Sequence, residues 1–549
     1  MSAEVDFQRL TFEYVRSRDQ GAAPPARRPV VIVGAGPVGL ALAIDLAQRK
    51  IPVVLLDNDN TLSTGSRAIC FAKRTLEIFD RLGCGEAMVA KGVSWHTGRV
   101  FFRDAQLYSF DLLAEDGHER PAFINLQQYY VEGYLARRAA QLALIDLRWN
   151  NKVVGVAQHA DHALLTIETP DGRYDLVADF VAACDGSRST VRELIGQKAE
   201  GRVFRDRFLI ADIKMNDLDR PAERWFWFDP SFHPNQSVLL HMQPDGVWRI
   251  DFQLGWDADP EVEKRPENII PRVRALLGHN AQFELEWASV YTFACQRMAR
   301  FRHGRVLFAG DAAHGVSPFG ARGANSGVQD ADNLGWKLAL VLQGTAPDAL
   351  LDSYADEREY AADENIRHST RATDFITPKS EVSRVFRDAV LDLAREHAFA
   401  RTLVNSGRLS VPATLHESTL NTPDSARFDG GVVLGAAAAD APVTLADGRD
   451  GWLLRELGDG FTALVFGGDA SLRDTALPGV PLKVLRIGAC GDKARTGHVI
   501  DRDGVVAERY DLRPGSVVLL RPDQHVCARW RQPSTEAVQH AMQRALAIH

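Results

Sequence analysis

Residues 27–59, RRPVVIVGAGPVGLALAIDLAQRKIPVVLLDND, decide how the N-terminal part of this chain is built. A short apolar run at residues 30–33 precedes a glycine-rich turn, and a second apolar run follows at residues 53–56. Between them the spacing of apolar side chains predicts a helix over residues 37–49. This order of elements predicts a strand–helix–strand unit with parallel strands.

The turn GAGPVG, residues 34–39, has glycines at the three positions that a dinucleotide-binding turn requires. Gly34 permits the tight turn, Gly36 lets the backbone approach a pyrophosphate, and Gly39 lets helix and strand pack closely. The N-terminus of the following helix favours an anion. Asp57 ends the second strand, where a carboxylate can accept hydrogen bonds from a ribose. Because glycine-rich turns also occur for structural reasons, the prediction of a dinucleotide site depends on these flanking elements.

A second glycine-rich stretch, VLFAGDAAHGVSPFGARGANSG, lies at residues 306–327. Gly310 and Asp311 stand where a buried strand should end, and GARGAN opens a helix predicted over residues 323–343. The free N–H groups at that helix start favour an anionic or electron-rich group. A capped amphipathic helix after a glycine-rich loop is the plain structural alternative. Two such turns in one chain favour a nucleotide site.

The residue types and the pattern of apolar residues change along the chain, which indicates several domains. Between about residues 202 and 296, short runs rich in β-branched and aromatic residues alternate with polar turns, as in an antiparallel sheet. GAAPPARRP, residues 21–29, reads as a linker, and Gly83 suits a left-handed helix cap. We expect five segments: an N-terminal arm at 1–28, a Rossmann-like domain at 29–200 and 297–380, an inserted antiparallel-sheet domain at 201–296, a helical connector at 381–425, and a C-terminal α/β domain at 426–549.

The composition limits the classes of function. The chain has 549 residues, a formal net charge of -8, 45% hydrophobic and 25% charged residues. This balance is typical of globular proteins and disfavours nucleic-acid binding. The six cysteines are scattered and no HExxH motif is present, so no metal site is expected and a cytoplasmic location is the simplest. Charges throughout the first 28 residues argue against a signal peptide, and no membrane span is expected.

Three motifs, in this order, resemble one protein family. They are the turn at 34–39, ACDGSRSTVR at 183–192, and GDAAHGVSPFGARGANSGVQDADNLGWKL at 310–338. Over about residues 30–370 the chain is similar to the single-component FAD-dependent aromatic hydroxylases of the p-hydroxybenzoate hydroxylase fold. Its length and C-terminal segment resemble the branch with phenol-type and 3-(3-hydroxyphenyl)propionate-type hydroxylases. The resemblance implies an α/β fold: a Rossmann-like FAD-binding domain of the GR2 type, the inserted antiparallel-sheet substrate domain, and a thioredoxin-like C-terminal domain that lacks a redox CxxC.

The resemblance also implies cofactor contacts, residue by residue. Gly34, Gly36 and Gly39 would hold the FAD pyrophosphate, and Asp57 the adenosine ribose. The other implied contacts with FAD or NAD(P)H are Arg67, Gln128 with Gln127 as its alternative, Asp185, Gly310, Asp311, Pro318, Gly323, Ala324 and Asn325. The commoner pattern in this branch is PPFGGQG, so the local departures are Ser317, Ala321 and Arg322. Related hydroxylases also carry GARG.

The implied reaction is the hydroxylation of a phenolic or related aromatic compound. NAD(P)H would visit transiently and reduce FAD, O2 would give the flavin C4a-hydroperoxide, and the terminal OH would pass to the ring. The protein must exclude water and help remove a phenol proton, because a phenol has a pKa of about 10. Candidate catalytic residues on the inserted sheet are His241, Arg249 and Tyr291. Candidate walls for the ring are Trp225, Trp227 and Phe319. An ordinary core role is the alternative for each, and His314 is expected to brace its loop.

Two other functions stay open. One is a flavin-dependent halogenase or a polyketide-ring hydroxylase; a halogenase of this fold would be expected to carry GWxWxIP, which GVWRIDF at residues 246–252 does not match. The other is a flavoprotein whose C-terminal domain mainly binds a partner. The expected partner is a small aromatic substrate, with neither nucleic acid nor membrane, and a homodimer is left open.

Overall fold

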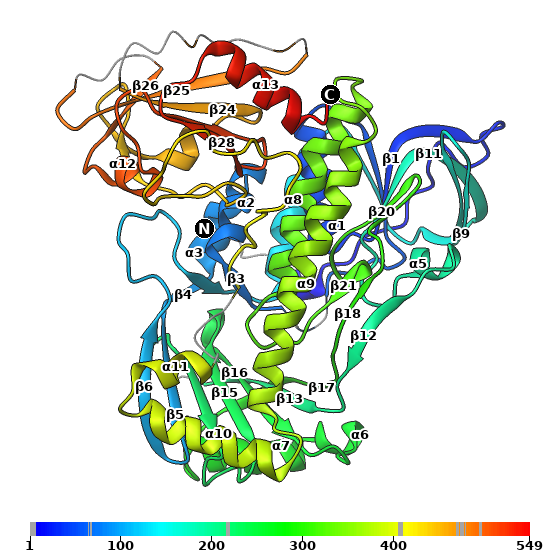
Figure 1. Ribbon diagram of the computed structural model, residues 1–549. Helices are drawn as coiled ribbons and strands as arrows, with labels where there is room; N and C mark the ends of the chain where they lie inside the picture. Colours follow the sequence, from blue (N-terminus) through cyan, green and yellow to red (C-terminus); the bar gives the residue numbers. More distant parts are fainter. Residues whose placement is uncertain are drawn as a thin grey trace.

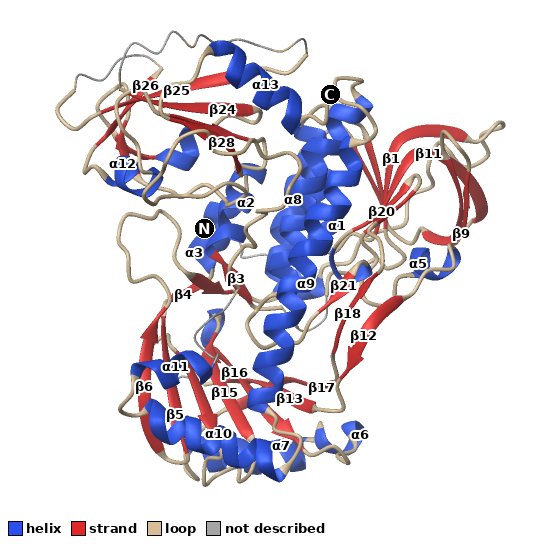
Figure 2. Cartoon of the chain, in the orientation of Figure 1, coloured by secondary structure: helices blue, strands red, loops and turns tan. Residues whose placement is uncertain are grey.

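The computed structural model describes residues 7–63, 65, 68–215, 220–404, 410–467, 472, 477, 479–492 and 497–548. In these residues the strands form five sheets, and the largest three lie in separate parts of the molecule (Figures 1 and 2). Long helices lie between them, so the chain has the expected α/β architecture.

The first of these is an eight-stranded sheet whose central strands run parallel. Its order is β19-β20-β11-β1-β2-β8, and β9 and β10 join as antiparallel neighbours of β11. Its strands are β1 (Ala26–Val33), β2 (Val53–Leu56), β8 (Ile145–Arg148), β9 (Lys152–Gln158), β10 (Ala163–Thr169), β11 (Gly172–Ala183), β19 (Arg302–His303) and β20 (Val306–Phe308). Helix α1 (Pro37–Gln48) joins β1 to β2, which pair in parallel, so the predicted strand–helix–strand unit is confirmed.

The second sheet has seven strands in the order β17-β13-β16-β15-β14-β5-β6. They are β5 (Thr97–Phe102), β6 (Ala105–Asp111), β13 (Arg207–Lys214), β14 (Arg224–Phe228), β15 (Ser237–Met242), β16 (Val247–Leu254) and β17 (Glu284–Tyr291). The five strands from β13 to β17 pair antiparallel, as predicted. The pairing of β14 with β5 is parallel, and it brings in two strands that precede the inserted segment. We call this the substrate sheet, after the expectation that the inserted domain binds the substrate.

The third sheet contains the C-terminal strands in the order β23-β22-β26-β25-β24-β27-β28. They are β22 (Pro442–Thr444), β23 (Asp450–Trp452), β24 (Phe461–Phe466), β25 (Leu482–Gly488), β26 (His498–Asp501), β27 (Val517–Leu520) and β28 (Val526–Trp530), with α12 (Val505–Tyr510) and α13 (Thr535–Ala545). Strands β24, β25 and β26 run parallel, whereas β27 and β28 are antiparallel additions.

Two short sheets and the remaining helices connect these three parts. The short sheets are β3 (Cys70–Ala72), β7 (Phe123–Asn125) and β4 (Val93–Trp95), and β12 (Ala199–Val203), β18 (Ala294–Met298) and β21 (His314–Gly315). The other helices are α2 (Lys73–Leu82), α3 (Gly85–Lys91), α4 (Gln128–Ala140), α5 (Thr190–Leu194), α6 (Pro260–Glu263), α7 (Pro266–Leu277), α8 (Gly323–Leu342), α9 (Leu350–Ile376), α10 (Glu381–Ala394) and α11 (Ala398–Val404). In the described part of the chain, no helix combines the length and the apolar character that crossing a membrane requires.

The predicted helix cap at Gly83 and the predicted linker at 21–29 have different outcomes. Gly83 ends α2 with φ of 85°, so the predicted left-handed cap is confirmed. The predicted linker at 21–29 is partly wrong, because β1 already begins at Ala26, which pairs with Leu176 of β11. Pairing with a strand far along the chain extends β1 beyond its apolar run.

Helix α9 connects the first two sheets, as Figure 1 shows. Near its start, the Tyr354 hydroxyl donates a hydrogen bond of 2.5 Å to the carbonyl of Phe308 in β20. At its other end, Ala372 and Ile376 pack into the apolar cluster on one face of the substrate sheet. The helix therefore holds that sheet at a defined position relative to the core sheet.

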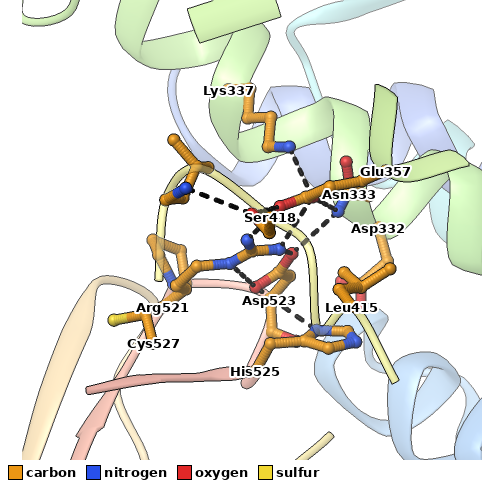
Figure 3. Close-up of polar contacts among 12 residues, drawn as sticks. Asp332, Asn333, Lys337, Glu357, Leu415, Ser418, Arg521, Asp523, His525 and Cys527 are labelled. Atoms are coloured by element: carbon orange, nitrogen blue, oxygen red, sulfur yellow. Dashed lines mark hydrogen bonds and ion pairs between the residues drawn. The ribbon is translucent and has the colours of Figure 1, made fainter. Parts of the chain in front are cut away.

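A buried ionic cluster anchors the C-terminal sheet to the helices of the core (Figure 3). Glu357 of α9 accepts hydrogen bonds from Lys337 Nζ at 2.7 Å and from Arg521 Nη1 at 2.5 Å. Arg521 also donates to Asp523 at 2.6 Å, and Asn333 of α8 donates to both carboxylates. Lys337, Glu357, Arg521 and Asp523 are all buried, so each charge depends on the others for compensation.

Candidate active site

Five predicted cofactor positions follow four strands at one edge of the core sheet. Gly34 follows β1, Asp57 follows β2, Asp185 comes shortly after β11, and Gly310 and Asp311 come shortly after β20. These four strands are neighbours and run parallel, so their carboxyl ends meet at the same edge. In open α/β sheets this edge is where ligands bind.

The three glycines of the turn have different surroundings. Gly34 has φ of +103°, and a Cβ there would lie 2.5 Å from the carbonyl oxygen of Cys184. A Cβ on Gly39 would lie 1.9 Å from the carbonyl oxygen of Gly34. A Cβ on Gly36 would meet no described atom within 4 Å. Gly34 and Gly39 are therefore required for packing, whereas Gly36 leaves an open approach to the backbone.

Two of the three carboxylates at this edge, Asp57 and Asp185, are partly buried. Asp57 accepts hydrogen bonds from the backbone N–H of Ala35 at 2.6 Å and of Asp59 at 2.9 Å, which ties β2 to the glycine turn. Asp185 Oδ2 accepts from Val191 N–H at 3.0 Å, but its buried Oδ1 has no partner in the described structure. Burial raises the pKa of both groups. The open Oδ1 atom can accept a hydrogen bond from a ligand hydroxyl.

Asp330 of α8 holds the loop at Gly310. Its carboxylate accepts from Gly310 N–H at 2.9 Å, lies 2.7 Å from His314 Nε2, and accepts from Arg358 at 2.6 Å. Burial by itself would raise the pKa of Asp330, but His314 and Arg358 bring it below its ordinary value. His314 thus contacts a carboxylate that fixes its own loop, in agreement with the bracing role expected for it.

The start of α8 is connected to the substrate sheet through β3. Asn325 accepts a hydrogen bond from Ala72 N–H at 2.8 Å and donates to the Cys70 carbonyl at 2.9 Å. Cys70 Sγ in turn lies 3.8 Å from His241 Nδ1 and 3.2 Å from Asn125 Oδ1. Burial raises the pKa of Cys70 to about 11, so it remains a thiol. Cys70 therefore bridges the start of α8 and His241, two predicted parts of the site that lie far apart in the sequence.

The other predicted cofactor positions differ in their surroundings. Gln128 donates to Ser63 Oγ at 3.0 Å and to Glu132 at 2.8 Å, whereas Gln127 donates to the carbonyl of Pro244 at 3.3 Å. Pro318 and Asp311 are exposed, and Gly323 and Ala324 form the partly buried first turn of α8. Arg67 lies outside the described residues. Ala321 has φ of 52°, a left-handed conformation, at the position where the commoner family pattern has glycine.

His241 and Arg249 face the same side of the substrate sheet, on adjacent strands. They pair directly across β15 and β16, and Arg249 pairs with Asp212 of β13. Arg249 donates two hydrogen bonds to Asp212, at 2.8 and 2.7 Å. His241 Nε2 has no hydrogen-bond partner in the described structure, and the nearest carboxylate, Asp251, is 3.7 Å away. Burial lowers the pKa of His241, so its imidazole is neutral at pH 7.

Tyr291 lies farther along the same face. Its ring stacks on Phe208 with centroids 6.0 Å apart, and Phe208 contacts Phe319 edge-on at 4.8 Å. Burial raises the pKa of Tyr291 well above 10, so its hydroxyl stays protonated and can only donate or accept hydrogen bonds. Phe319 therefore packs against the face that carries Tyr291 and His241, and its role as a wall for the ring stays a prediction.

Trp225 and Trp227 do not form such a wall. They lie on the opposite face of the substrate sheet, where Phe101 contacts them at 5.6 and 5.0 Å. Because side chains alternate along a strand, the residue in phase with His241 is Arg224 rather than either tryptophan. Sequence reasoning missed Arg224, Asp212 and Asp251 on this face. The alternation in RWFWF and VWRIDF was a usable signal, but it needs the strand register to be interpreted.

Known proteins resemble this chain in sequence and in fold. A family model described as "FAD binding domain" matches residues 27–369. The chain is 31% identical to the 6-methylpretetramide 4-monooxygenase of Streptomyces rimosus, over 96% of this chain and 94% of that protein. It is 28% identical to a 3-(3-hydroxy-phenyl)propionate/3-hydroxycinnamic acid hydroxylase of Mycolicibacterium smegmatis, over 91% and 90% of the two chains. Its fold is similar to the crystal structure of the flavin-dependent monooxygenase PieE in complex with FAD and substrate, with a TM-score of 0.80, 22% identity and coverage of 95% and 99%.

Proposed function

Because this chain belongs to the family of FAD-dependent aromatic hydroxylases and is a flavin-dependent monooxygenase, we propose that it hydroxylates a phenolic or related aromatic compound, using NAD(P)H and O2. One observation carries the proposal beyond the family. The strand β3 connects the start of α8 to a sheet face on which a neutral, buried histidine has an open nitrogen. Such a face can accept a proton from a phenol close to the cofactor.

The edge of the core sheet fits FAD. The open approach at Gly36 and the N-terminus of α1 suit a pyrophosphate, and the open Oδ1 atom of Asp185 suits a hydroxyl. The family resemblance implies that Asp57 binds the adenosine ribose, and the hydrogen bond from Ala35 N–H, which holds Asp57 beside the glycine turn, supports this role. When bound, FAD takes electrons from NAD(P)H and supplies the activation of O2.

The described side chains support separate tasks for the three candidate catalytic residues. His241 accepts the phenol proton at Nε2, because its lowered pKa keeps that nitrogen unprotonated at neutral pH. Arg249 is fixed by Asp212 and acts as a positioning residue on the same face. Tyr291 and the neighbouring rings of Phe208 and Phe319 exclude water.

The test is an oxidation assay on the purified yellow protein. Phenols, benzoates, pyridines and phenylpropanoids are screened for stimulation of NADH or NADPH oxidation, followed by mass spectrometry of the products. A stimulating compound that gains one oxygen atom is the expected result. Oxidation that is slow and indifferent to every aromatic compound would contradict the proposal and favour a flavoprotein that mainly binds a partner.

Replacement of His241 is expected to reduce turnover strongly. A His241→Asn variant should lose about 10²- to 10⁴-fold in kcat/KM, the usual contribution of a general base. Since burial lowers the pKa of His241 below its ordinary value of 6.5, wild-type activity should persist as the pH falls through 6.5 and decrease only at a lower pH, where the imidazole becomes protonated. The variant should lack this acid limb. Steady-state pH profiles measure both effects, and the exposed His279 provides a matched control as His279→Asn. A profile unchanged in the His241 variant would remove the residue from the mechanism.

A polyketide ring is the second candidate substrate. The relative from Streptomyces rimosus is named as a 6-methylpretetramide monooxygenase and aligns over almost the whole chain. Adding tetracyclic and anthracycline-type phenols to the screen separates the two substrate classes. Stimulation by these compounds alone would favour the polyketide assignment over a simple phenol.

We also propose a fold for the C-terminal domain, a location and an oligomeric state. The order β26-β25-β24-β27-β28 with a closing α13 supports a thioredoxin-like C-terminal domain over residues 426–549, without redox chemistry because it has no CxxC. Six free cysteine thiols support a cytoplasmic location. A homodimer is proposed from the family resemblance, and sedimentation velocity tests it; a single species of monomer mass would refute it.

A further inference from the structure

Two buried arginines lie in one row across the substrate sheet and differ in their partners. Arg224 of β14 stands one position before the pair Trp225–Leu240, which places it across from His241, and His241 pairs with Arg249. Arg249 is 2% exposed and forms two hydrogen bonds with Asp212. Arg224 is 7% exposed, yet in the described part of the chain it has no carboxylate within 4.0 Å and its buried Nη1 donates no hydrogen bond.

A guanidinium in this state needs a partner that the chain does not supply. It has five N–H donors, and a buried charge without hydrogen bonds is costly. Asp251 is the carboxylate whose charge acts on Arg224, but no ion pair within 4.0 Å joins the two in the described part of the chain, so Asp251 balances the charge of Arg224 from a distance and forms no hydrogen bond with it. Burial lowers the pKa of Arg224, in keeping with this lack of a partner.

His241, on the neighbouring strand, has a ring nitrogen that lacks a hydrogen-bond partner in the described structure, as Nη1 of Arg224 does. Cys70 is placed to donate its S–H to Asn125 Oδ1 at 3.2 Å, which leaves Sγ free to accept from His241 at 3.8 Å, and on this contact we assign the proton of the neutral imidazole to Nδ1. This tautomer leaves Nε2 as an acceptor, and Nε2 has no partner. An open donor and an open acceptor thus lie on adjacent strands of one face.

We propose that Arg224 is a substrate-binding residue that recognises an anionic oxygen of the aromatic substrate beside His241. The inference rests on the proposed hydroxylase function. When the oxygen is the ring hydroxyl, its O–H bond breaks, the proton goes to His241 Nε2, and the electron pair stays on the oxygen as a phenolate that accepts hydrogen bonds from Arg224. The imidazolium and the phenolate cancel, so the net charge of the face does not change. A carboxylate substituent also presents an anionic oxygen to Arg224. The experiment below distinguishes a phenolate from a carboxylate.

The experiment compares ligand binding to the FAD-loaded wild type and to Arg224→Met by isothermal titration calorimetry. The probes are 4-nitrophenol, which has a ring hydroxyl and no carboxylate, and benzoate, which has a carboxylate and no hydroxyl. Weakening of at least 10-fold for 4-nitrophenol assigns Arg224 to the ring oxygen. The same loss for benzoate alone assigns it to a carboxylate substituent. Affinities within twofold of the wild type for both probes would overturn the proposal.

Two further variants exclude a merely structural role. Arg224→Lys keeps the charge but not the planar fork, and it should recover part of the lost affinity. Arg99→Met on the adjacent strand removes an arginine that Glu223 already pairs, and binding of both probes should not change. Because Arg224→Met removes an unpaired buried charge, it should melt no lower than the wild type. A much lower melting temperature would instead show that Arg224 serves the fold. Wild-type binding of 4-nitrophenol without its hydroxylation would count against the proposed reaction and not against this site.

Discussion

The Gly39→Ala variant is expected to bind FAD roughly 5- to 150-fold more weakly than the wild type. An alanine Cβ would lie 1.9 Å from the carbonyl oxygen of Gly34, so α1 must shift away from the turn. Forcing an extra methyl group into such a contact costs about 1–3 kcal/mol, which corresponds to this range of affinity. Titration of the apoprotein with FAD, followed by flavin fluorescence, measures the effect.

Two other glycine variants make the test specific. Gly36→Ala adds a Cβ that meets no described atom within 4 Å, so the apoprotein should melt as the wild type does while FAD affinity still falls. Gly255→Ala also meets no described atom within 4 Å, lies on a loop of the inserted segment, and should change neither quantity. Wild-type FAD affinity in both the Gly36 and Gly39 variants would show that this turn does not hold the cofactor.

The Glu357→Gln variant is expected to lower the free energy of unfolding by about 3–5 kcal/mol. Glutamine keeps the shape of the side chain but leaves Lys337 and Arg521 buried without their shared carboxylate, and only Arg521 still has Asp523. Urea denaturation followed by circular dichroism measures the loss. Asp356→Asn, one residue away on the exposed side of α9, should cost about 0–1 kcal/mol. Equal stabilities for the two variants would mean that the cluster does not anchor the C-terminal sheet.

The same carboxylate gives stability a defined dependence on pH. Burial by itself would raise the pKa of Glu357, but Arg521 and Lys337 hold it well below its ordinary value of 4.5. A depressed folded-state pKa stabilises the protein above the unfolded pKa. The stabilisation should therefore be lost as the pH falls below about 4.5 in the wild type. Glu357→Gln should lack that part of the acid sensitivity.

Much of the site could be predicted because its determinants are local. The turn at 34–39, the cap at Gly83 and the start of α8 follow from glycine conformation and from apolar spacing within a few residues. The same reasoning proposed Trp225 and Trp227 as ring walls together with His241 as the base, but both tryptophans lie on the opposite face of the sheet from His241. In that case a strand was recognised, but the side that faces the cofactor depends on neighbours that are distant in sequence.

By itself, the sequence determined the family, the strand–helix–strand unit and the edge of the sheet where a dinucleotide would bind, because spacing and glycine positions are properties of short stretches. Tertiary structure alone decided that β5 and β6 complete the substrate sheet, that Arg224 and His241 share one face, and that Glu357 meets Arg521. These features depend on strand register, burial and charge pairing between residues that lie far apart in the chain. Only such neighbours shift the pKa of a side chain and decide which of its hydrogen-bonding groups lack a partner.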